Sequence, residues 1–346
     1  MCNFKTFIVS VMNDKRRGPA AAVTGFLLLA ASWAYALGIA IVGAGYRTGI
    51  RKVRKAPVPV VSVGNITLGG TGKTPFTIFL AEYLLGAGRR PAVLTRGYGS
   101  DEDKMTKEEL AEVPVHVGRQ RYRSAEKAAA WGCDVLLMDD GFQHRSLRRD
   151  LDIVLVDSVS GFGNGKLFPR GVLREPLSAI KRADIVVLTK TDMAGEERTE
   201  KIRLEISRVS GAEKFVYAAH RPLFLSDAAG AGYETGMLEG KRVCMVSGIV
   251  DPEYLRFIIE RAGADVVSSV AFDDHHAYTA KDAIRIKKAF SGSAADTMVT
   301  TKKDHVKLRN LDIGPLEERL FVLNVVMEIK KGKEILFAGL NNVICD

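Results

Sequence analysis

The chain has 346 residues, 47% of them hydrophobic and 26% charged, and this composition excludes an intrinsically disordered protein. Its length is typical of about two domains. The net charge of +9 is concentrated at the N-terminus: residues 1–55 carry nine Lys or Arg and one acid, whereas the remainder carries 41 basic and 40 acidic residues. We therefore expect no nucleic-acid partner, and a basic N-terminal region that suits an anionic membrane surface.

The most apolar stretch of the chain lies inside this basic region. From Pro19 to Tyr46 there are 28 residues without a charge, more than the ~20 that cross a bilayer core. A cleaved signal peptide fits poorly, because its apolar region has about 7–15 residues before a cleavage site. The alternative of a helix that lies in the membrane interface, or in a groove of the protein, stays open, because a stretch rich in Ala and Gly is only moderately hydrophobic. We expect a membrane-associated helix with basic flanks over residues 1–55.

A strand, a glycine-rich loop and a helix follow in VVSVGNITLGGTGKTPF. The strand is expected over Val58–Val63, and the helix over Pro75–Leu85, with its Pro in the first turn. The loop ends as a P-loop does (G-x-x-x-x-G-K-[ST]), although Thr67 replaces the first Gly. Backbone N–H groups of such a loop converge on phosphate oxygens, Lys73 reaches the β- and γ-phosphates, and the Thr74 hydroxyl ligates Mg²⁺. The residues expected to bind the nucleotide here are Thr67, Leu68, Gly69, Gly70, Thr71, Gly72, Lys73 and Thr74.

Strand-like and helical runs alternate through the rest of the chain, and this alternation predicts a parallel sheet with helices on its faces. The strand-like runs are Ala92–Thr95, Val135–Met138, Ile153–Val156 and Ile185–Leu188. The fold class is therefore α/β: a P-loop NTPase-type parallel sheet with helices on both faces, an N-terminal membrane helix and a second, smaller α/β domain. The Gly- and Ala-rich stretch Leu223–Gly240 marks the expected boundary. We assign residues 56–235 to the P-loop domain and 236–346 to the smaller domain.

A P-loop needs a carboxylate for Mg²⁺ at the end of a neighbouring strand, and the apolar run Val135–Met138 ends in two acids. We favour Asp139 as the metal ligand and keep Asp140 as the alternative. A second candidate is the run that ends at Asp157. The stretch 189–192 (TKTD) resembles the guanine-reading NKxD motif with Thr in place of Asn, which weakens the hypothesis of a GTPase without excluding it.

Several motifs together resemble the tetraacyldisaccharide 4′-kinase family: VGNITLGGTGKTP, RGYG at 96–99, DDGFQH at 139–144, FGNGKLFPRGVLREP at 162–176 and FDDHHAY at 272–278. The resemblance implies transfer of the ATP γ-phosphate to the 4′-hydroxyl of a tetraacyl glucosamine disaccharide 1-phosphate in lipid A biosynthesis. It implies ATP and Mg²⁺ as cofactors, and the cytoplasmic face of the inner membrane as location. The expected partners are the acylated disaccharide phosphate and membrane lipids. No protein partner is evident and we expect a monomer.

The resemblance also implies a catalytic pair for the acceptor hydroxyl. Asp101 matches the family's base, Glu102 an acid near Mg²⁺ and Arg121 a phosphate or substrate contact, while His275 matches the partner of the base. The sequence departs from the family here, because Ser100-Asp101-Glu102-Asp103 directly follows RGYG, where the family has an intervening stretch and Gly-Asp-Glu-Pro. A solvated acidic turn is the alternative interpretation of this segment.

A further loop, rich in Gly, carries Asn164, Arg174 and Glu175. We expect Asn164 and Glu175 to contact substrate and Arg174 to stabilise charge on the transferring phosphate. A surface Arg–Glu pair is the alternative. Gln143 and His144 are expected to line the nucleotide pocket. Two rival functions stay open at this point: a membrane-bound switch NTPase, and a catalytically impaired member of the same family.

Overall fold

The computed structural model describes residues 4–97, 107, 109–274, 276–309, 311 and 314–344. The chain forms two compact units. Unit 1 comprises residues 1–96, 116–218 and 329–346, and unit 2 comprises residues 97–115 and 219–328. The domain ranges expected from the sequence stay a prediction, but unit 1 includes the last residues of the chain, which we had assigned to the smaller domain.

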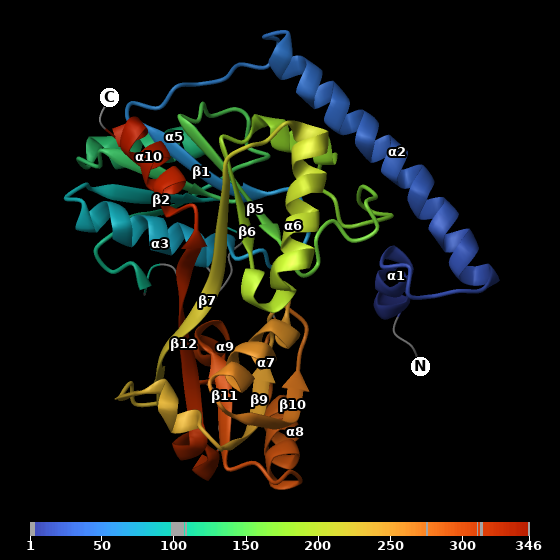
Figure 1. Cartoon of the computed structure of the whole chain (residues 1–346), viewed down its shortest axis with the longest axis vertical. Coiled ribbons are helices and arrows are strands. Elements are labelled where there is room, and N and C mark those ends of the chain that lie inside the picture. The colour runs from blue at the N-terminus through green and yellow to red at the C-terminus, as the bar shows by residue number, and fades with distance from the viewer. Residues whose placement is uncertain are drawn as a thin grey trace. The chain divides into compact units, whose positions relative to one another are not determined.

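Unit 1 is built on a sheet with the strand order β7-β6-β5-β1-β4-β2-β3. The pairs β1–β4, β1–β5, β2–β4, β5–β6 and β6–β7 are all parallel, as the alternation of strands and helices predicted. Its elements in chain order are α1 (Phe4–Met12), α2 (Pro19–Arg47), β1 (Val60–Asn65), α3 (Lys73–Gly86), β2 (Pro91–Thr95), β3 (Val115–Val117), α5 (Arg121–Ala130), β4 (Val135–Asp139), β5 (Leu151–Asp157), the 3₁₀ helix η1 (Leu177–Arg182), β6 (Ile185–Thr189), α6 (Thr191–Ser210), β7 (Phe215–Ser226) and α10 (Lys333–Ile344) (Figure 1).

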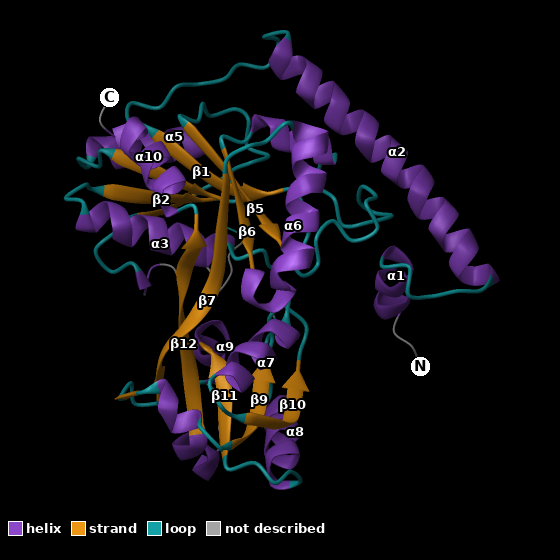
Figure 2. Cartoon of the chain, viewed as in Figure 1, coloured by secondary structure: helices purple, strands orange, loops and turns teal. Residues whose placement is uncertain are grey.

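Helices cover both faces of this sheet (Figure 2). On one face, α5 packs on Val60, Leu136 and Met138, and the register places Val60 of β1 beside Leu136 of β4. Helix α6 packs on residues of β5 and β6 on the same face. On the other face, Tyr83 of α3 stacks on Phe337 of α10 with ring centroids 4.1 Å apart. Strands buried on both faces have near-continuous apolar runs, which is why β1, β4 and β6 were recognisable in the sequence.

Unit 2 contains a smaller parallel sheet with the order β10-β9-β11-β12. A core of Cys244, Val246, Ile286, Phe290 and Met298 joins β9 and β11 to α8. The elements are β8 (Gly232–Tyr233), the 3₁₀ helix η2 (Thr235–Leu238), β9 (Arg242–Ser247), α7 (Pro252–Arg261), β10 (Asp265–Ala271), α8 (Ala280–Ser291), β11 (Thr297–Thr301), α9 (Lys302–Leu308), the 3₁₀ helix η3 (Gly314–Arg319) and β12 (Leu320–Lys331). The chain passes between the units along β7 and β12.

Helix α2 is the one described helix that is long and apolar enough to cross a membrane, with a mean hydropathy of 2.0 over its best window, of which 6% is buried. Gly18 precedes the helix and Pro19 lies in its first turn, a position at which proline is favoured. Only Ala21, Ser32 and Gly43 are buried. These small residues face the protein, so the bulky apolar side chains of α2 are left on its outer surface.

Candidate functional site

The glycine-rich loop lies between the carboxyl end of β1 and the first turn of α3, as expected. Gly69 and Gly72 have φ angles of 119° and 83°, which glycine adopts without strain. Lys73 is the first residue of α3. Because the first N–H groups of a helix lack intrahelical partners, this loop and helix start can bind an anion.

Asp139 lies at the end of β4, the parallel neighbour of β1, and contacts the start of α3. The Thr74 hydroxyl donates to Asp139 Oδ2 over 3.1 Å, and the Thr77 hydroxyl donates to Oδ1 over 3.4 Å. Burial raises the pKa of this carboxyl, although the Lys73 charge acts in the opposite direction. The contact with Thr74 places this carboxylate beside the hydroxyl that we expected to ligate Mg²⁺.

Asp140 points to a different set of groups. Its Oδ1 lies 3.6 Å from Lys73 Nζ and accepts a 2.9 Å hydrogen bond from Arg174 Nη1. Burial alone would raise the pKa of Asp140, but the positive charges of Lys73, Arg174 and Arg121 outweigh burial and hold its pKa below the usual value. Asp140 has a φ of 50°, a left-handed conformation that Asp tolerates better than most residues. The two adjacent acids thus contact different groups: Asp139 accepts from hydroxyl groups of α3, and Asp140 pairs with Lys73 and Arg174.

The turn after these acids packs tightly on β1. Gly141 N–H donates to the Val63 carbonyl over 2.9 Å. A Cβ at Gly64 would lie 2.5 Å from Phe142 Cβ and 2.6 Å from Phe142 N, closer than Cβ contacts in proteins allow. The close approach of the two backbones therefore depends on glycine at position 64.

Two buried side chains hold Thr71 in the middle of the glycine-rich loop. Asn65 Nδ2 donates to Thr71 Oγ1 over 3.0 Å, and the Thr189 hydroxyl donates to the Thr71 carbonyl over 3.1 Å. Gln143 Nε2 in turn donates to the Asn65 carbonyl over 2.9 Å. We did not anticipate Asn65, and we considered Thr189 only as part of the TKTD stretch. Each lies at the end of an apolar strand, and only the fold shows which loop it meets.

Glu175 is buried, with a side chain 4% exposed, and takes part in a network within unit 1. Arg145 Nη2 donates to its Oε2 over 2.6 Å, and Arg182 donates to both carboxylate oxygens over 2.9 and 3.0 Å. Gln143 also donates to Glu175, over 3.2 Å. The surface Arg–Glu pair that we kept as an alternative is not what the structure shows: Arg174 pairs with Asp140, and Glu175 pairs with Arg145 and Arg182.

Arg121 and His144 lie near the two acids, and the charge of Arg121 affects the pKa values of this group of side chains. Arg121 begins α5, is buried, and its charge acts on Asp139, Asp140 and His144. Burial, together with the charges of Arg121 and Arg149, lowers the pKa of His144 to about 4. His144 Nε2 lies 3.0 Å from the Ser146 hydroxyl. His144 is therefore a neutral imidazole near pH 7.

Asn164 holds together the loop through which the body of unit 1 contacts the N-terminal helices. Its Nδ2 donates to the carbonyls of Met12 and Arg170 over 2.8 and 3.2 Å, and its Oδ1 accepts from the Lys166 N–H. Helix α2 docks on the same loop: Ser32 Oγ donates to the Leu167 carbonyl over 2.8 Å and accepts from the Arg170 N–H over 2.9 Å.

The three remaining expected residues, Asp101, Glu102 and His275, lie outside the described residues. Among the residues that the structure does describe, no group of three or more His, Cys, Asp or Glu could hold a metal ion. Mg²⁺ in kinases is held by one or two protein ligands together with substrate phosphates, so the Thr74–Asp139 pair is the kind of donor set that fits this ion.

Comparison with known proteins decides the family. A family model described as tetraacyldisaccharide-1-P 4′-kinase matches residues 24–108 and 100–344. The chain belongs to this kinase family. A tetraacyldisaccharide 4′-kinase of Anaeromyxobacter dehalogenans is 38% identical over 94% of this chain and 92% of its own length, and that of Syntrophus aciditrophicus is 35% identical over 92% of each.

A solved structure of the same family is also similar. The crystal structure of "apo" form LpxK from Aquifex aeolicus in complex with ATP covers 92% of this chain and 99% of its own, with 28% identity and a TM-score of 0.72. These findings confirm the family resemblance and the α/β fold class. The chain is accordingly an ATP-dependent kinase.

Proposed function

We propose that this kinase transfers the γ-phosphate of ATP to the 4′-hydroxyl of a tetraacylated glucosamine disaccharide 1-phosphate, a step in lipid A biosynthesis, at the cytoplasmic face of the inner membrane. The names of the relatives support the reaction and the acceptor. The observation that carries the proposal is the meeting of Lys73, Thr74, Asp139 and Asp140 at the ends of β1 and β4. In phosphoryl transfer the protein mainly positions the reactants and stabilises charge, and these groups suit both tasks.

For the nucleotide, the proposal assigns the phosphates to the loop Thr67–Thr74, with Gln143 and His144 beside it. Lys73 is placed at the helix start to interact with the β- and γ-phosphates. Thr74 and Asp139 would hold Mg²⁺, and Asp140 is the alternative ligand. When bound, this ion neutralises charge on the β- and γ-phosphate oxygens. Asp140 keeps the ammonium of Lys73 and the guanidinium of Arg174 near each other, so both cations are available to the transferring phosphoryl group.

For the acceptor, the proposal rests on the sequence resemblance. Asp101 accepts the proton of the 4′-hydroxyl, His275 orients Asp101 and raises its basicity, and Glu102 lies near the metal. Arg121 contacts the phosphate or the substrate. Asn164 supports the substrate side indirectly, since its side-chain amide is taken up by the carbonyls of Met12 and Arg170 and by the Lys166 N–H. Glu175 supports the site indirectly through Gln143, since its carboxylate is already taken up by Arg145 and Arg182.

The proposal also includes an interfacial position for α2. Contacts with the body of unit 1 run along the helix, from Ser32 through Tyr35, whose hydroxyl donates to the Arg174 carbonyl over 3.0 Å, to Gly43 beside Arg145. A helix that spans a bilayer needs ~20 residues in the hydrocarbon core. If α2 spanned the bilayer, the loops that contact it would be drawn into this core, where burying their polar groups is costly. A helix in the membrane plane avoids this cost. The side chains that it would present to lipid are Val23, Phe26, Leu27, Trp33, Leu37 and Ile41.

The test is a kinase assay with purified full-length protein, labelled ATP, Mg²⁺ and tetraacyl disaccharide 1-phosphate in detergent. A lipid kinase yields a bis-phosphorylated lipid in proportion to the ADP formed. A switch NTPase releases phosphate without labelling the lipid, and an impaired family member binds ATP without either product. Lys73→Ala is the matched negative control, for which we expect at least a ~100-fold lower kcat.

A further inference from the structure

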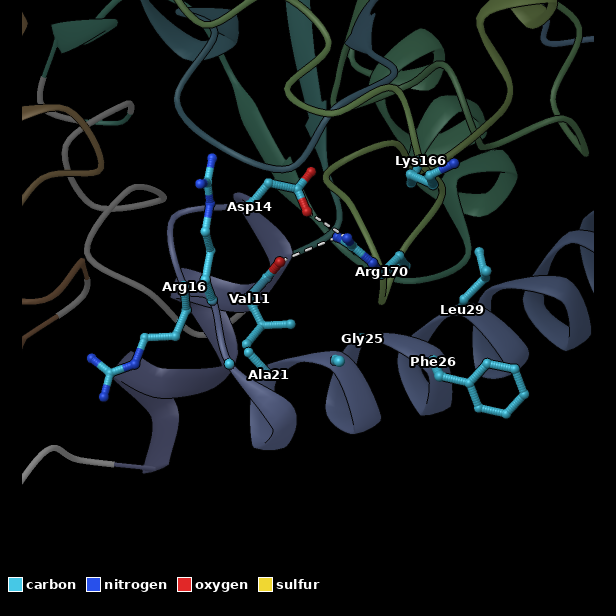
Figure 3. A pocket seen from close by; sticks show the side chains of 12 residues that line it. Val11, Asp14, Arg16, Ala21, Gly25, Phe26, Leu29, Lys166 and Arg170 are labelled. Carbon is cyan, nitrogen blue, oxygen red and sulfur yellow. Dashed lines mark hydrogen bonds and ion pairs between the residues drawn. The ribbon is translucent and has the colours of Figure 1, made fainter.

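A cavity lies between the two N-terminal helices and the loop that carries Lys166 and Arg170 (Figure 3). Its volume is about 430 Å³, within the range of small-molecule sites. It is bounded by the end of α1, by the turn Asp14–Gly18 and by the first turns of α2. Its polar lining comes from Asp14, Arg16, Arg17, Lys166 and Arg170.

The charges around this cavity are unbalanced. Four basic side chains line it against one acid, Asp14. Arg170 is committed to the protein, because it forms an ion pair with Asp14 and donates to the Val11 carbonyl over 3.2 Å, as Figure 3 shows. Arg16, Arg17 and Lys166 have no salt-bridge partner within the described part of the chain, although Arg16 Cζ lies 5.8 Å from the centre of the Phe7 ring and the Lys166 charge acts on Asp14. These three exposed residues stand at the rim of the cavity, whose single acid is paired with Arg170, and in Figure 3 the Arg16 side chain extends away from the cavity, so it has to turn inward to reach a bound anion.

The apolar side of the cavity comes from α2. Ala22 and Leu29 line it, and Phe26 beside them is 70% exposed on the outer surface of the helix. Phe26 is one of the residues that the interfacial position of α2 would turn toward lipid. A ligand that fits both halves of this lining has an anionic group for the cations and an apolar part that continues along α2.

We propose that this cavity binds the phosphate head group of an anionic membrane phospholipid, with Arg16, Arg17 and Lys166 around the phosphate and the acyl chains along Ala22, Phe26 and Leu29. The inference rests on the interfacial position of α2 proposed above. It adds a defined lipid site to that position, at the start of α2 and formed by residues to which we assign no role in phosphoryl transfer. Bound lipid would fix the height and tilt of the α1–α2 region relative to the bilayer.

The experiment measures binding of the full-length protein to vesicles of phosphatidylcholine alone and to vesicles that also contain phosphatidylglycerol. Wild-type protein should bind the anionic vesicles at least tenfold more tightly, in line with the attraction of several basic residues to an anionic surface. Two variants test the cavity. Ala22→Phe fills it without a change of charge, and the double variant R16Q/R17Q removes two exposed cations. Each should lower the preference for anionic vesicles at least about fivefold.

Each variant has a matched control outside the cavity. Ala30→Phe adds the same side chain to another exposed position of α2, and K52Q/K55Q removes two exposed cations of the same basic region. Both controls should keep the anionic preference. An equal loss in K52Q/K55Q and R16Q/R17Q would show diffuse attraction and overturn the site. If Ala22→Phe lowers the melting temperature, R16Q/R17Q decides the result alone.

Soluble probes distinguish the source of the phosphate. Short-chain phosphatidylglycerol below its micelle concentration should saturate binding to wild-type protein, whereas inorganic phosphate at the same concentration should not. Equal binding of inorganic phosphate would overturn the assignment to lipid. Absence of binding to any vesicle would overturn both this site and the interfacial position. Turnover of detergent-dispersed acceptor reports separately on the proposed kinase reaction, so its failure cannot be mistaken for failure of the site.

Discussion

The Thr74 hydroxyl and the Asp139 carboxylate lie 3.1 Å apart, joining the first turn of α3 to the end of β4. The parallel register that sets Val63 beside Asp139 brings these two elements together. Asp139 is therefore the acid that accepts a hydrogen bond from the Thr74 hydroxyl, while Asp140 forms an ion pair with Lys73. This geometry favours Asp139 as the ligand in the proposed Mg²⁺ site.

Substitutions at these positions separate the two acids. Thr74→Ala and Asp139→Asn should each lower kcat at least ~100-fold, because they remove the groups that would hold the ion beside the transferring phosphate. They should also raise the Mg²⁺ concentration needed for half-maximal rate. Thr74→Ser keeps the hydroxyl and should retain most of the activity. The measurement is initial rate against Mg²⁺ concentration. A normal Mg²⁺ dependence in Asp139→Asn, with an altered one in Asp140→Asn, would reverse the assignment.

A second prediction concerns the close approach of β1 to the turn that follows the two acids. Gly64→Ala would place a methyl group 2.6 Å from a backbone nitrogen, Phe142 N, which cannot rotate away. Overpacking of this kind costs about 1–3 kcal/mol in the free energy of unfolding. Gly86→Ala, at the end of α3 with nothing within 4 Å, is the control and should leave stability unchanged or slightly higher. Denaturant titration of both variants measures the difference.

The buried ion pair between Lys190 and Asp157 supports a third prediction. Lys190 Nζ donates to Asp157 Oδ2 over 2.6 Å, and both side chains are at most 6% exposed. Lys190→Met leaves a buried carboxylate without its cation, which costs about 3–5 kcal/mol. The double variant K190M/D157N removes both charges and should recover a large part of that loss. Equal stability of the single and double variants would show that Asp157 keeps its charge solvated by other means.

His144 gives a prediction on pH. Its pKa of about 4 lies below its ordinary value of 6.5, because burial and nearby arginines disfavour the charged ring. Between these two values the unfolded chain binds more protons than the folded one, so the contribution of His144 to stability is complete above pH 6.5 and is lost as pH falls toward 4. The pH profile of the unfolding free energy should be flatter over this window in His144→Gln than in wild-type protein. Parallel profiles would contradict the lowered pKa.

Much of unit 1 was predictable because its signals are local. The apolar runs of β1, β4, β5 and β6, the GKT sequence and the acids after Met138 each occupy a few consecutive residues. The structure confirms these strands with shifts of one or two residues at their ends. Strands buried on both faces, followed by loops with functional groups, are typical of parallel sheets.

Features that depend on distant parts of the chain could not be predicted in this way. The return of α10 to unit 1, where Phe337 stacks on Tyr83, joins residues that are far apart in the sequence. Glu175 looked like a partner of Arg174, its neighbour in the sequence, but Arg145 and Arg182 reach it in the fold. The Gly- and Ala-rich stretch assigned to a domain boundary also contains the end of β7 and all of β8. Pattern alone cannot show which side chains a loop or strand end will meet.

Two tyrosine–aspartate hydrogen bonds in unit 2 allow a matched test of burial. Tyr278 Oη donates to Asp304 Oδ1, and Tyr233 Oη donates to Asp227 Oδ2, each over 2.9 Å. Asp304 is fully buried and also accepts from the Thr301 hydroxyl, whereas Asp227 and Tyr233 lie at the surface. Burial and the neighbouring Asp304 charge raise the pKa of Tyr278, so its hydroxyl stays protonated and donates.

Tyr278→Phe should therefore destabilise the protein by about 1–3 kcal/mol, because a buried carboxylate oxygen loses its donor and water cannot replace it. The phenyl ring keeps its packing on Phe272, whose ring centroid lies 5.0 Å away. Tyr233→Phe should change stability by less than about 0.5 kcal/mol, since water reaches the exposed Asp227. Denaturant unfolding of both variants gives the two values. A loss of the same size in Tyr233→Phe would show that burial does not set the difference. A negligible loss in Tyr278→Phe would show that the Asp304 carboxylate finds another donor when the Tyr278 hydroxyl is removed.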